Sequence, residues 1–174
     1  MPYNPPNIYC IDSSAFITMH RYYPKRIMPD LWNNIDNLFK EGRIISHEFV
    51  FDEIVNDSDQ KDELSKFIQP YKDFFGSITQ SQLSFVQEIV TLFPKLIDVN
   101  CKKDQADPWI ISLMLEIITR NTLFGSNDHY ILVSAESENS DFKIPAVCKH
   151  YNIRHLNVFE FFEDNGWSFN MTSS

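Results

Sequence analysis

Carboxylates stand just beyond two short apolar segments of the sequence. Asp12 directly follows residues 7–11, Asn-Ile-Tyr-Cys-Ile, and Glu136 comes soon after residues 130–133, Tyr-Ile-Leu-Val. Short apolar runs between polar residues are typical of buried parallel strands. Ligands bind outside the carboxyl ends of such strands, so both acids are candidates for the chemistry of a site there.

Two further acids are placed by predicted helices. Asp107 lies at the start of residues 106–119, which are apolar almost all round and predict a helix at the centre of the core. Glu53 is in register with the apolar residues of its helix, and an acid on an inward face must be paired or must hold a cation. Asp104 lies one turn before Asp107 and is an alternative to Glu136 as the fourth acid of such a site.

A cluster of these carboxylates would suit hard divalent cations. Mg²⁺ and Mn²⁺ prefer oxygen ligands, keep several waters and share a substrate phosphate. One or two such ions would polarise a phosphodiester and lower the pKa of a bound water for in-line attack, without a covalent protein nucleophile. In this hypothesis Asp12 and Asp107 are direct ligands, Glu53 is a ligand or water-orienting base, and Glu136 is a second-metal or outer-shell group.

Each acid also has a structural interpretation. Asp104 or Asp107 would stabilise a helix N-terminus, where negative charge meets the helix dipole. Asp12 would close the turn after its strand, with Ser13 or Ser14 capping the next helix. Glu53 would be a surface residue if the helix phase is shifted, and Glu136 would belong to a solvated acidic loop.

Other kinds of catalytic motif are missing. The four glycines form neither a phosphate-binding loop nor a dinucleotide-binding turn, and no serine-hydrolase motif occurs. The histidines have no zinc spacing, and a site made of Cys148, His150 and His155 is a weak alternative to packing. The three cysteines are widely separated, which favours reduced thiols in a cytoplasmic protein.

Composition predicts one globular domain. The 174 residues are 43% hydrophobic and 22% charged, enough to bury a core, which we place at about 7–166 with poorly ordered termini. Neither a signal peptide nor a membrane span is predicted. The net charge of −9 disfavours nucleic-acid binding unless metal ions or a basic partner offset it.

Short apolar strands alternate with amphipathic helices. We expect strands at 7–11, 43–45, 130–133 and 153–156, and helices at 31–39, 46–54, 59–75, 80–92, 106–119, 145–150 and 158–163, besides one after Ser14. This alternation predicts a single three-layer α/β/α domain with a mostly parallel central sheet of four or five strands.

A basic and aromatic cluster occupies residues 20–26, His-Arg-Tyr-Tyr-Pro-Lys-Arg. Cations bind phosphates and aromatic rings stack on unpaired bases, so Arg21, Lys25 and Arg26 are candidate substrate-binding residues. Ser14 would hydrogen-bond a carboxylate or the phosphate. The structural alternative is a solvated loop with the two tyrosines packed inward.

The ordered set of motifs resembles the PIN-domain family. Its segments are Ile-Asp-Ser-Ser at 11–14, Ser-His-Glu-Phe-Val-Phe-Asp-Glu-Ile at 46–54, Ala-Asp-Pro-Trp-Ile-Ile at 106–111 and Leu-Val-Ser-Ala-Glu at 132–136. A Tyr-Tyr-Pro after the first motif and a late Lys143-Ile-Pro with Cys148 are similar to an uncharacterised prokaryotic PIN-like branch. The resemblance covers residues 7 to 166.

That resemblance implies a metal-dependent endoribonuclease that binds Mg²⁺ or Mn²⁺. Asp12, Glu53 and Asp107 match the three core acids, and Glu136 stands where the family usually has an aspartate. Many relatives are VapC-type toxins held inactive by an antitoxin, so RNA, a cognate antitoxin protein and a second copy of the chain are the expected partners.

Two alternatives remain open at this stage. A PIN-like module that binds RNA or protein without hydrolysis would fit the glutamate at 136 and the net acidity. A phosphohydrolase with Asp12 as the nucleophile would commonly carry a second aspartate two residues later, where this sequence has Ser14.

Overall fold

The computed structural model describes residues 6–56, 63–101, 105–125 and 127–168. Within them a five-stranded sheet has the order β3-β2-β1-β4-β5, and each pair of neighbouring strands is parallel. The strands are β1 (Ile8–Ile11), β2 (Ile44–His47), β3 (Phe75–Gly76), β4 (Tyr130–Val133) and β5 (His155–Leu156). The central position of β1 places the residue after it, Asp12, in the middle of the carboxyl edge.

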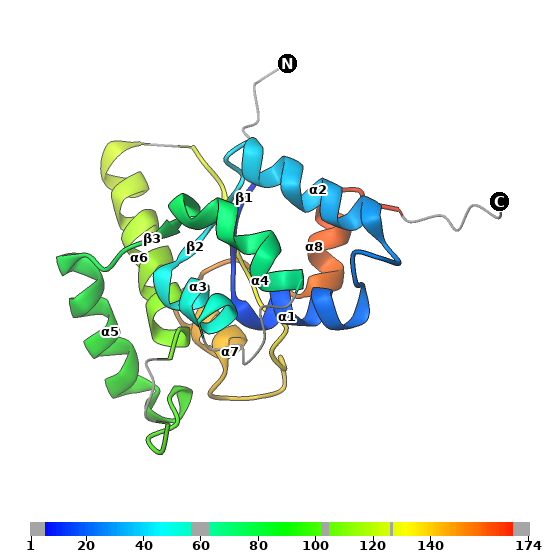
Figure 1. Ribbon diagram of the computed structural model, residues 1–174. Coiled ribbons are helices and arrows are strands. Elements are labelled where there is room, and N and C mark those ends of the chain that lie inside the picture. Colours follow the sequence, from blue (N-terminus) through cyan, green and yellow to red (C-terminus); the bar gives the residue numbers. More distant parts are fainter. Residues whose placement is uncertain (1–5, 57–62, 102–104, 126, 169–174) are drawn as a thin grey trace.

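Helices cover both faces of the sheet (Figure 1). One layer contains α1 (Ser13–Tyr22), α2 (Pro29–Lys40), α3 (Glu48–Val55), α4 (Glu63–Ile68) and α8 (Val158–Asp164). The other contains α5 (Gln80–Leu92), α6 (Asp107–Phe124) and α7 (Ile144–His150). Two 3₁₀ segments, η1 (Gln69–Phe74) and η2 (Pro94–Leu96), complete the described chain. The three-layer α/β/α prediction is confirmed.

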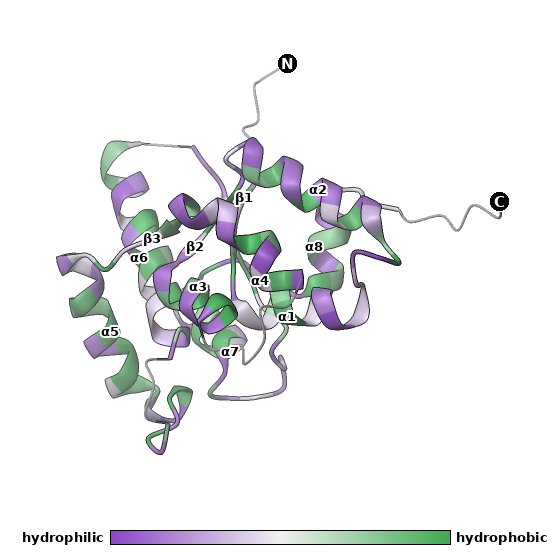
Figure 2. Cartoon of the chain, viewed as in Figure 1, coloured by the Kyte–Doolittle hydropathy of each residue, from purple (hydrophilic) through white to green (hydrophobic). Residues whose placement is uncertain are grey.

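The core is built from the sheet and the inward helix faces. Tyr9, Cys10 and Ile11 are completely buried in β1, as are Ile131 to Val133 in β4. The outer helices show hydrophilic and hydrophobic bands that alternate along their length (Figure 2), as expected when only one face meets the sheet. Two buried central strands hold their carboxyl ends rigidly, which is a requirement for a precise site.

Three predictions about element boundaries are wrong. The helix predicted at 46–54 begins only at Glu48, because Ser46 and His47 are the last residues of β2. The helix expected at 59–75 is shorter: α4 ends at Ile68 and gives way to η1, because Pro70 has no N–H to donate to an α-helical hydrogen bond. Phe75, the last residue of that predicted helix, instead begins the edge strand β3. Helix α6 extends past Thr119 to Phe124 and ends at Gly125, whose φ of 68° is a left-handed C-cap.

Two further observations bear on the predictions. No helix among the described residues is both long and apolar enough to cross a lipid bilayer. Residues 1–5 and 169–174, where poorly ordered termini are predicted, lie outside the described residues, as does Asp104.

Candidate active site

Asp12 lies where the central strand β1 meets helix α1. Its Oδ2 accepts a hydrogen bond of 3.0 Å from Ser14 N, so Asp12 is the N-cap of α1 and the predicted cap by Ser13 or Ser14 is wrong. The residue is only 1% exposed, and its Oδ1 has no hydrogen-bond partner among the described residues. A buried carboxylate oxygen without a donor is unfavourable unless another group compensates it.

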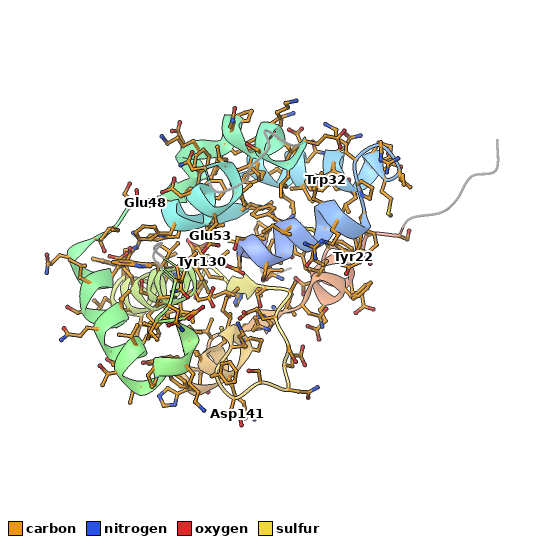
Figure 3. All side chains as sticks on the ribbon, turned by 60° about the horizontal axis from the view of Figure 1, so that its bottom comes forward. Tyr22, Trp32, Glu48, Glu53, Tyr130 and Asp141 are labelled. Atoms are coloured by element: carbon orange, nitrogen blue, oxygen red, sulfur yellow. The ribbon has the colours of Figure 1, made fainter. Side chains whose placement is uncertain are left out.

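Glu53 joins the starts of two helices. Its Oε1 accepts a hydrogen bond of 3.0 Å from Ala106 N, at the start of α6, and its Oε2 accepts one from Ser13 Oγ, at the start of α1. In Figure 3 the Glu53 side chain lies on the inner side of α3, near the beginning of α1. The predicted inward orientation of this glutamate is therefore confirmed, and its partners are the N-terminal groups of the two helices that carry Asp12 and Asp107.

Asp107 is the first residue of α6 and is half-buried. Burial raises the pKa of its carboxyl to about 8, and the negative charges of Asp12, Glu136 and Glu53 add to that rise, while Lys143 opposes it. A like charge raises the pKa of a carboxyl because it disfavours the ionised form. All three of the other predicted acids therefore act electrostatically on Asp107.

Glu136 lies in the loop between β4 and α7, with its side chain 14% exposed. Its Oε2 accepts a hydrogen bond of 2.8 Å from Ile144 N, and its Oε1 is 3.0 Å from Lys143 Nζ. Both oxygens of this carboxylate thus have partners, unlike those of Asp12.

The pKa of Asp12 reflects the same crowding. Burial raises it to about 6, the hydrogen bonds from Ser14 lower it, and the charges of Glu53 and Glu136 raise it again. Both aspartates at this edge thus hold a proton more readily than an ordinary aspartate does. A cation bound between them would favour the charged forms and remove the penalty.

The donor atoms fit a divalent metal in kind, because they are all carboxylate oxygens. Among the described parts of the chain, however, no group of three or more His, Cys, Asp or Glu side chains is already arranged to hold a metal ion. The carboxylates of Glu53 and Glu136 instead accept hydrogen bonds from protein donors. The Oδ1 atom of Asp12 is buried and has no hydrogen-bond partner among the described residues.

The predicted substrate-binding residues lie in two places. Ser14 is in the acidic region, where its Oγ accepts a hydrogen bond of 3.0 Å from Ala135 N. Arg21, Lys25 and Arg26 are exposed at the far end of α1, which ten residues make about 15 Å long. There, Arg21 and Arg26 line an open depression of about 690 Å³ with Lys66 and His20.

The structural interpretation of the two tyrosines is half right. Tyr23 packs inward, with its ring 5.6 Å from that of Phe162, whereas Tyr22 is 67% exposed. The weak zinc alternative gains no support, because Cys148 is completely buried in the core and His155 Nε2 instead lies 2.8 Å from Ser134 Oγ.

Sequence reasoning missed two residues of the acidic region, Ser13 and Lys143. Ser13 holds Glu53, and Lys143 pairs with Glu136. The sequence contained one usable signal for Lys143. It comes seven residues after Glu136 and directly before the Ile-Pro start of α7, so the chain brings it back to the edge where β4 ends.

The fold and the acids define the class: a three-layer α/β/α protein with four interacting carboxylates at the carboxyl edge of a parallel sheet. The chain belongs to the family described as a domain of unknown function, DUF4411, whose profile matches residues 9–169. No curated protein matches the sequence.

The chain is similar to solved structures. One of them is that of VapBC2 from Rickettsia felis bound to a DNA fragment from their promoter. The likeness covers 86% of this chain and 98% of that chain, with 18% sequence identity and a TM-score of 0.47. At this level the likeness carries no information about individual residues or activity.

Proposed function

We propose that this protein is a divalent-metal-dependent endoribonuclease that hydrolyses RNA phosphodiester bonds, with its site at the acidic edge of the sheet. One observation carries the proposal: the carboxylates of Asp12, Glu53, Asp107 and Glu136 interact electrostatically, and the buried Oδ1 of Asp12 has no donor in the described chain. An arrangement that raises the pKa of two aspartates at a strand edge is a marker of function and opposes stability.

Asp12 and Asp107 would hold Mg²⁺ or Mn²⁺ directly, because they have the least compensated carboxylates. When bound, the ion would supply Lewis-acid polarisation of the phosphate and an activated water. Glu53, fixed by Ser13 and Ala106 N, would accept a hydrogen bond from that water and orient it for attack. The rigid link from Glu53 to both helix starts keeps this geometry constant.

Two aromatic rings near the acids support a nucleic-acid substrate. Phe49 lies one helical turn before Glu53 on α3, and Trp109 follows Asp107 by two residues on α6. Their ring centroids are 5.1 Å apart, and both residues are only partly buried. A partly exposed ring beside a phosphate-cleaving site offers a stacking surface for an unpaired base.

The decisive experiment is RNA cleavage by the purified protein. Structured and single-stranded RNAs are incubated with Mn²⁺, with Mn²⁺ and excess chelator, and with Mn²⁺ restored after chelation. The proposal predicts RNA cleavage that the chelator abolishes and Mn²⁺ restores. Single-stranded DNA is incubated in parallel as a comparison substrate. Cleavage that survives chelation would rule out this chemistry.

A second candidate is a non-catalytic module that binds RNA or protein at the same edge. It is favoured by one observation, the absence of a ready-made three-ligand arrangement among the described residues. A calorimetric titration with Mn²⁺ separates the two candidates. The nuclease requires saturable binding that Asp107→Asn weakens, whereas the module would bind Mn²⁺ weakly and without regard to Asp107.

The PIN-like resemblance extends the proposal to partners. In that case the protein is the toxin of a toxin–antitoxin pair, and a cognate antitoxin or a second copy would cover part of its surface. Co-expression with the product of a neighbouring small gene, followed by size-exclusion chromatography, tests this extension. A complex that suppresses RNA cleavage supports it, and free, uninhibited protein contradicts it.

A further inference from the structure

Lys143 brings a positive charge to the acidic edge. Its Nζ is 3.0 Å from Glu136 Oε1, and its charge also acts on Asp107 and Asp12. The side chain is 39% exposed, so a ligand arriving from solvent can reach it.

Glu136 is anchored from the other side. The backbone N–H of Ile144, at the start of α7, donates 2.8 Å to Oε2, which leaves Oε1 directed at the Lys143 ammonium. A metal ion bound at Oε1 would meet the positive charge of the Lys143 ammonium, which disfavours direct coordination there. Glu136 is therefore better placed to hold Lys143 than to serve as a fourth metal ligand.

We propose that Lys143 is a catalytic residue that contacts a non-bridging oxygen of the scissile phosphate, and that Glu136 is its positioning residue. The inference rests on the proposed nuclease function. An ammonium is a compact charge with three donors, which suits phosphate, and its hydrogen bonds to anions are stronger than neutral ones. The negative charge that develops on the phosphate during attack is stabilised by a donor already held in place.

The test uses the full chain and four variants: Lys143→Gln, Lys143→Arg, Glu136→Gln and Lys149→Gln. Lys149 is the matched control, because it is an exposed lysine on the same helix and its loss changes the net charge equally. Each variant is measured for kcat and KM in RNA cleavage, for Mn²⁺ affinity without RNA, and for melting temperature by circular dichroism.

Lys143→Gln is expected to lower kcat about 100-fold, the size seen when one donor to a developing anion is removed. The same change should tighten Mn²⁺ binding about threefold, because a cation no longer opposes the metal. Lys143→Arg should recover most of kcat, Glu136→Gln should lower it nearly as much as Lys143→Gln, and the double variant should add little. Lys149→Gln should match the wild type.

The outcomes distinguish a failure of the role proposed for Lys143 from a failure of the nuclease function. If the wild type cleaves RNA and the Lys143→Gln variant is equally active, this inference is overturned but the nuclease function stands. Weaker Mn²⁺ binding in Lys143→Gln would mean that the lysine helps to build the metal site, which also overturns it. A wild type that cleaves no RNA in Mn²⁺ overturns the nuclease function and the role of Lys143 with it.

Discussion

The acids at the two ends of the sheet differ in their partners. At the amino end, Asp164 accepts hydrogen bonds from Asn7 Nδ2 at 2.7 Å and Tyr9 Oη at 2.6 Å, and it pairs with Arg154 at 2.7 Å. At the carboxyl end, Asp12 has one oxygen without a partner in the described chain, and the negative charges of Glu53 and Glu136 act on it.

The pKa values follow the partners. The pKa of Asp164 lies below its ordinary value, because the donors of Tyr9, Asn7 and Arg154 outweigh the effect of burial. The pKa values of Asp12 and Asp107 are raised to about 6 and about 8, because burial and like charges dominate. An acid whose charge is balanced by protein donors stabilises the fold, whereas a buried acid among like charges opposes folding and marks a candidate functional site.

The largest effect is expected from Asp12→Asn. Asparagine keeps the N-cap of α1 but weakens the ligand for a divalent ion, so RNA cleavage should fall by about 10³-fold or more. The melting temperature without metal should stay equal or rise, since a buried charge is removed. Cleavage assays and thermal melts are made on the same preparations, and undiminished cleavage would contradict the assignment.

Asp164→Asn is the converse experiment. It removes the charged acceptor shared by Tyr9, Asn7 and Arg154, and we expect a loss of about 1–2 kcal/mol in unfolding free energy, moderated by solvent exposure. Cleavage at a temperature well below the melting point should be unchanged. Urea denaturation provides the measurement, and a loss of activity without a loss of stability would break the comparison.

The two ends should also respond oppositely to pH. Asp12 and Asp107 have raised pKa values in the folded state, so their contribution to stability is full below about pH 4 and is lost as pH rises through about 6 and about 8. Asp164 has a lowered pKa, so its contribution is present above about pH 4 and is lost at more acidic pH.

Metal-free urea denaturation between pH 5 and pH 8 isolates the carboxyl-end acids. Relative to the wild type, the double variant Asp12→Asn, Asp107→Asn should lose the decline in stability with rising pH. Saturating Mn²⁺ should offset the decline in the wild type, with a gain of about 2.7 kcal/mol at 100 times the dissociation constant. A decline of equal size in the double variant would assign it to other groups.

The smallest effect is expected at the basic depression around Arg21, Arg26 and Lys66, which is about 15 Å from the acids along α1. Replacing Arg21 and Arg26 by Gln should weaken single-stranded RNA binding only a few-fold. It should also reduce the slope of log affinity against log salt by about 0.7 per lost phosphate contact. Fluorescence anisotropy across a salt series measures both, and an unchanged slope would remove this surface from the RNA path.

Local sequence patterns predicted most of the fold. The fully apolar runs at β1 and β4 and the apolar segment of α6 each carry their own signal, and so does the abrupt change from Ile11 to Asp12. The edge strand β3 has only two residues, which is too short for a hydrophobic periodicity. Its pairing with Ser46 and His47 is a tertiary contact that the local sequence does not predict.

The acidic region was predictable in part. The carboxyl-edge rule and helix phase together led to Asp12, Glu53, Asp107 and Glu136, and the structure places these four within electrostatic reach. Their detailed states were not predictable, because they depend on donors from other segments: Ser13 and Ala106 for Glu53, and Ile144 and Lys143 for Glu136. Hydrogen bonds between residues far apart in the sequence cannot be predicted from local sequence patterns.

The most direct test of the central claim is anomalous diffraction from crystals grown or soaked in Mn²⁺. Data collected near the manganese absorption edge locate the ion without reference to any assay. The account predicts an anomalous peak at coordinating distance from Asp12 Oδ1 and an Asp107 carboxylate oxygen. A peak confined to other surface acids, or none at this edge at millimolar Mn²⁺, would contradict it.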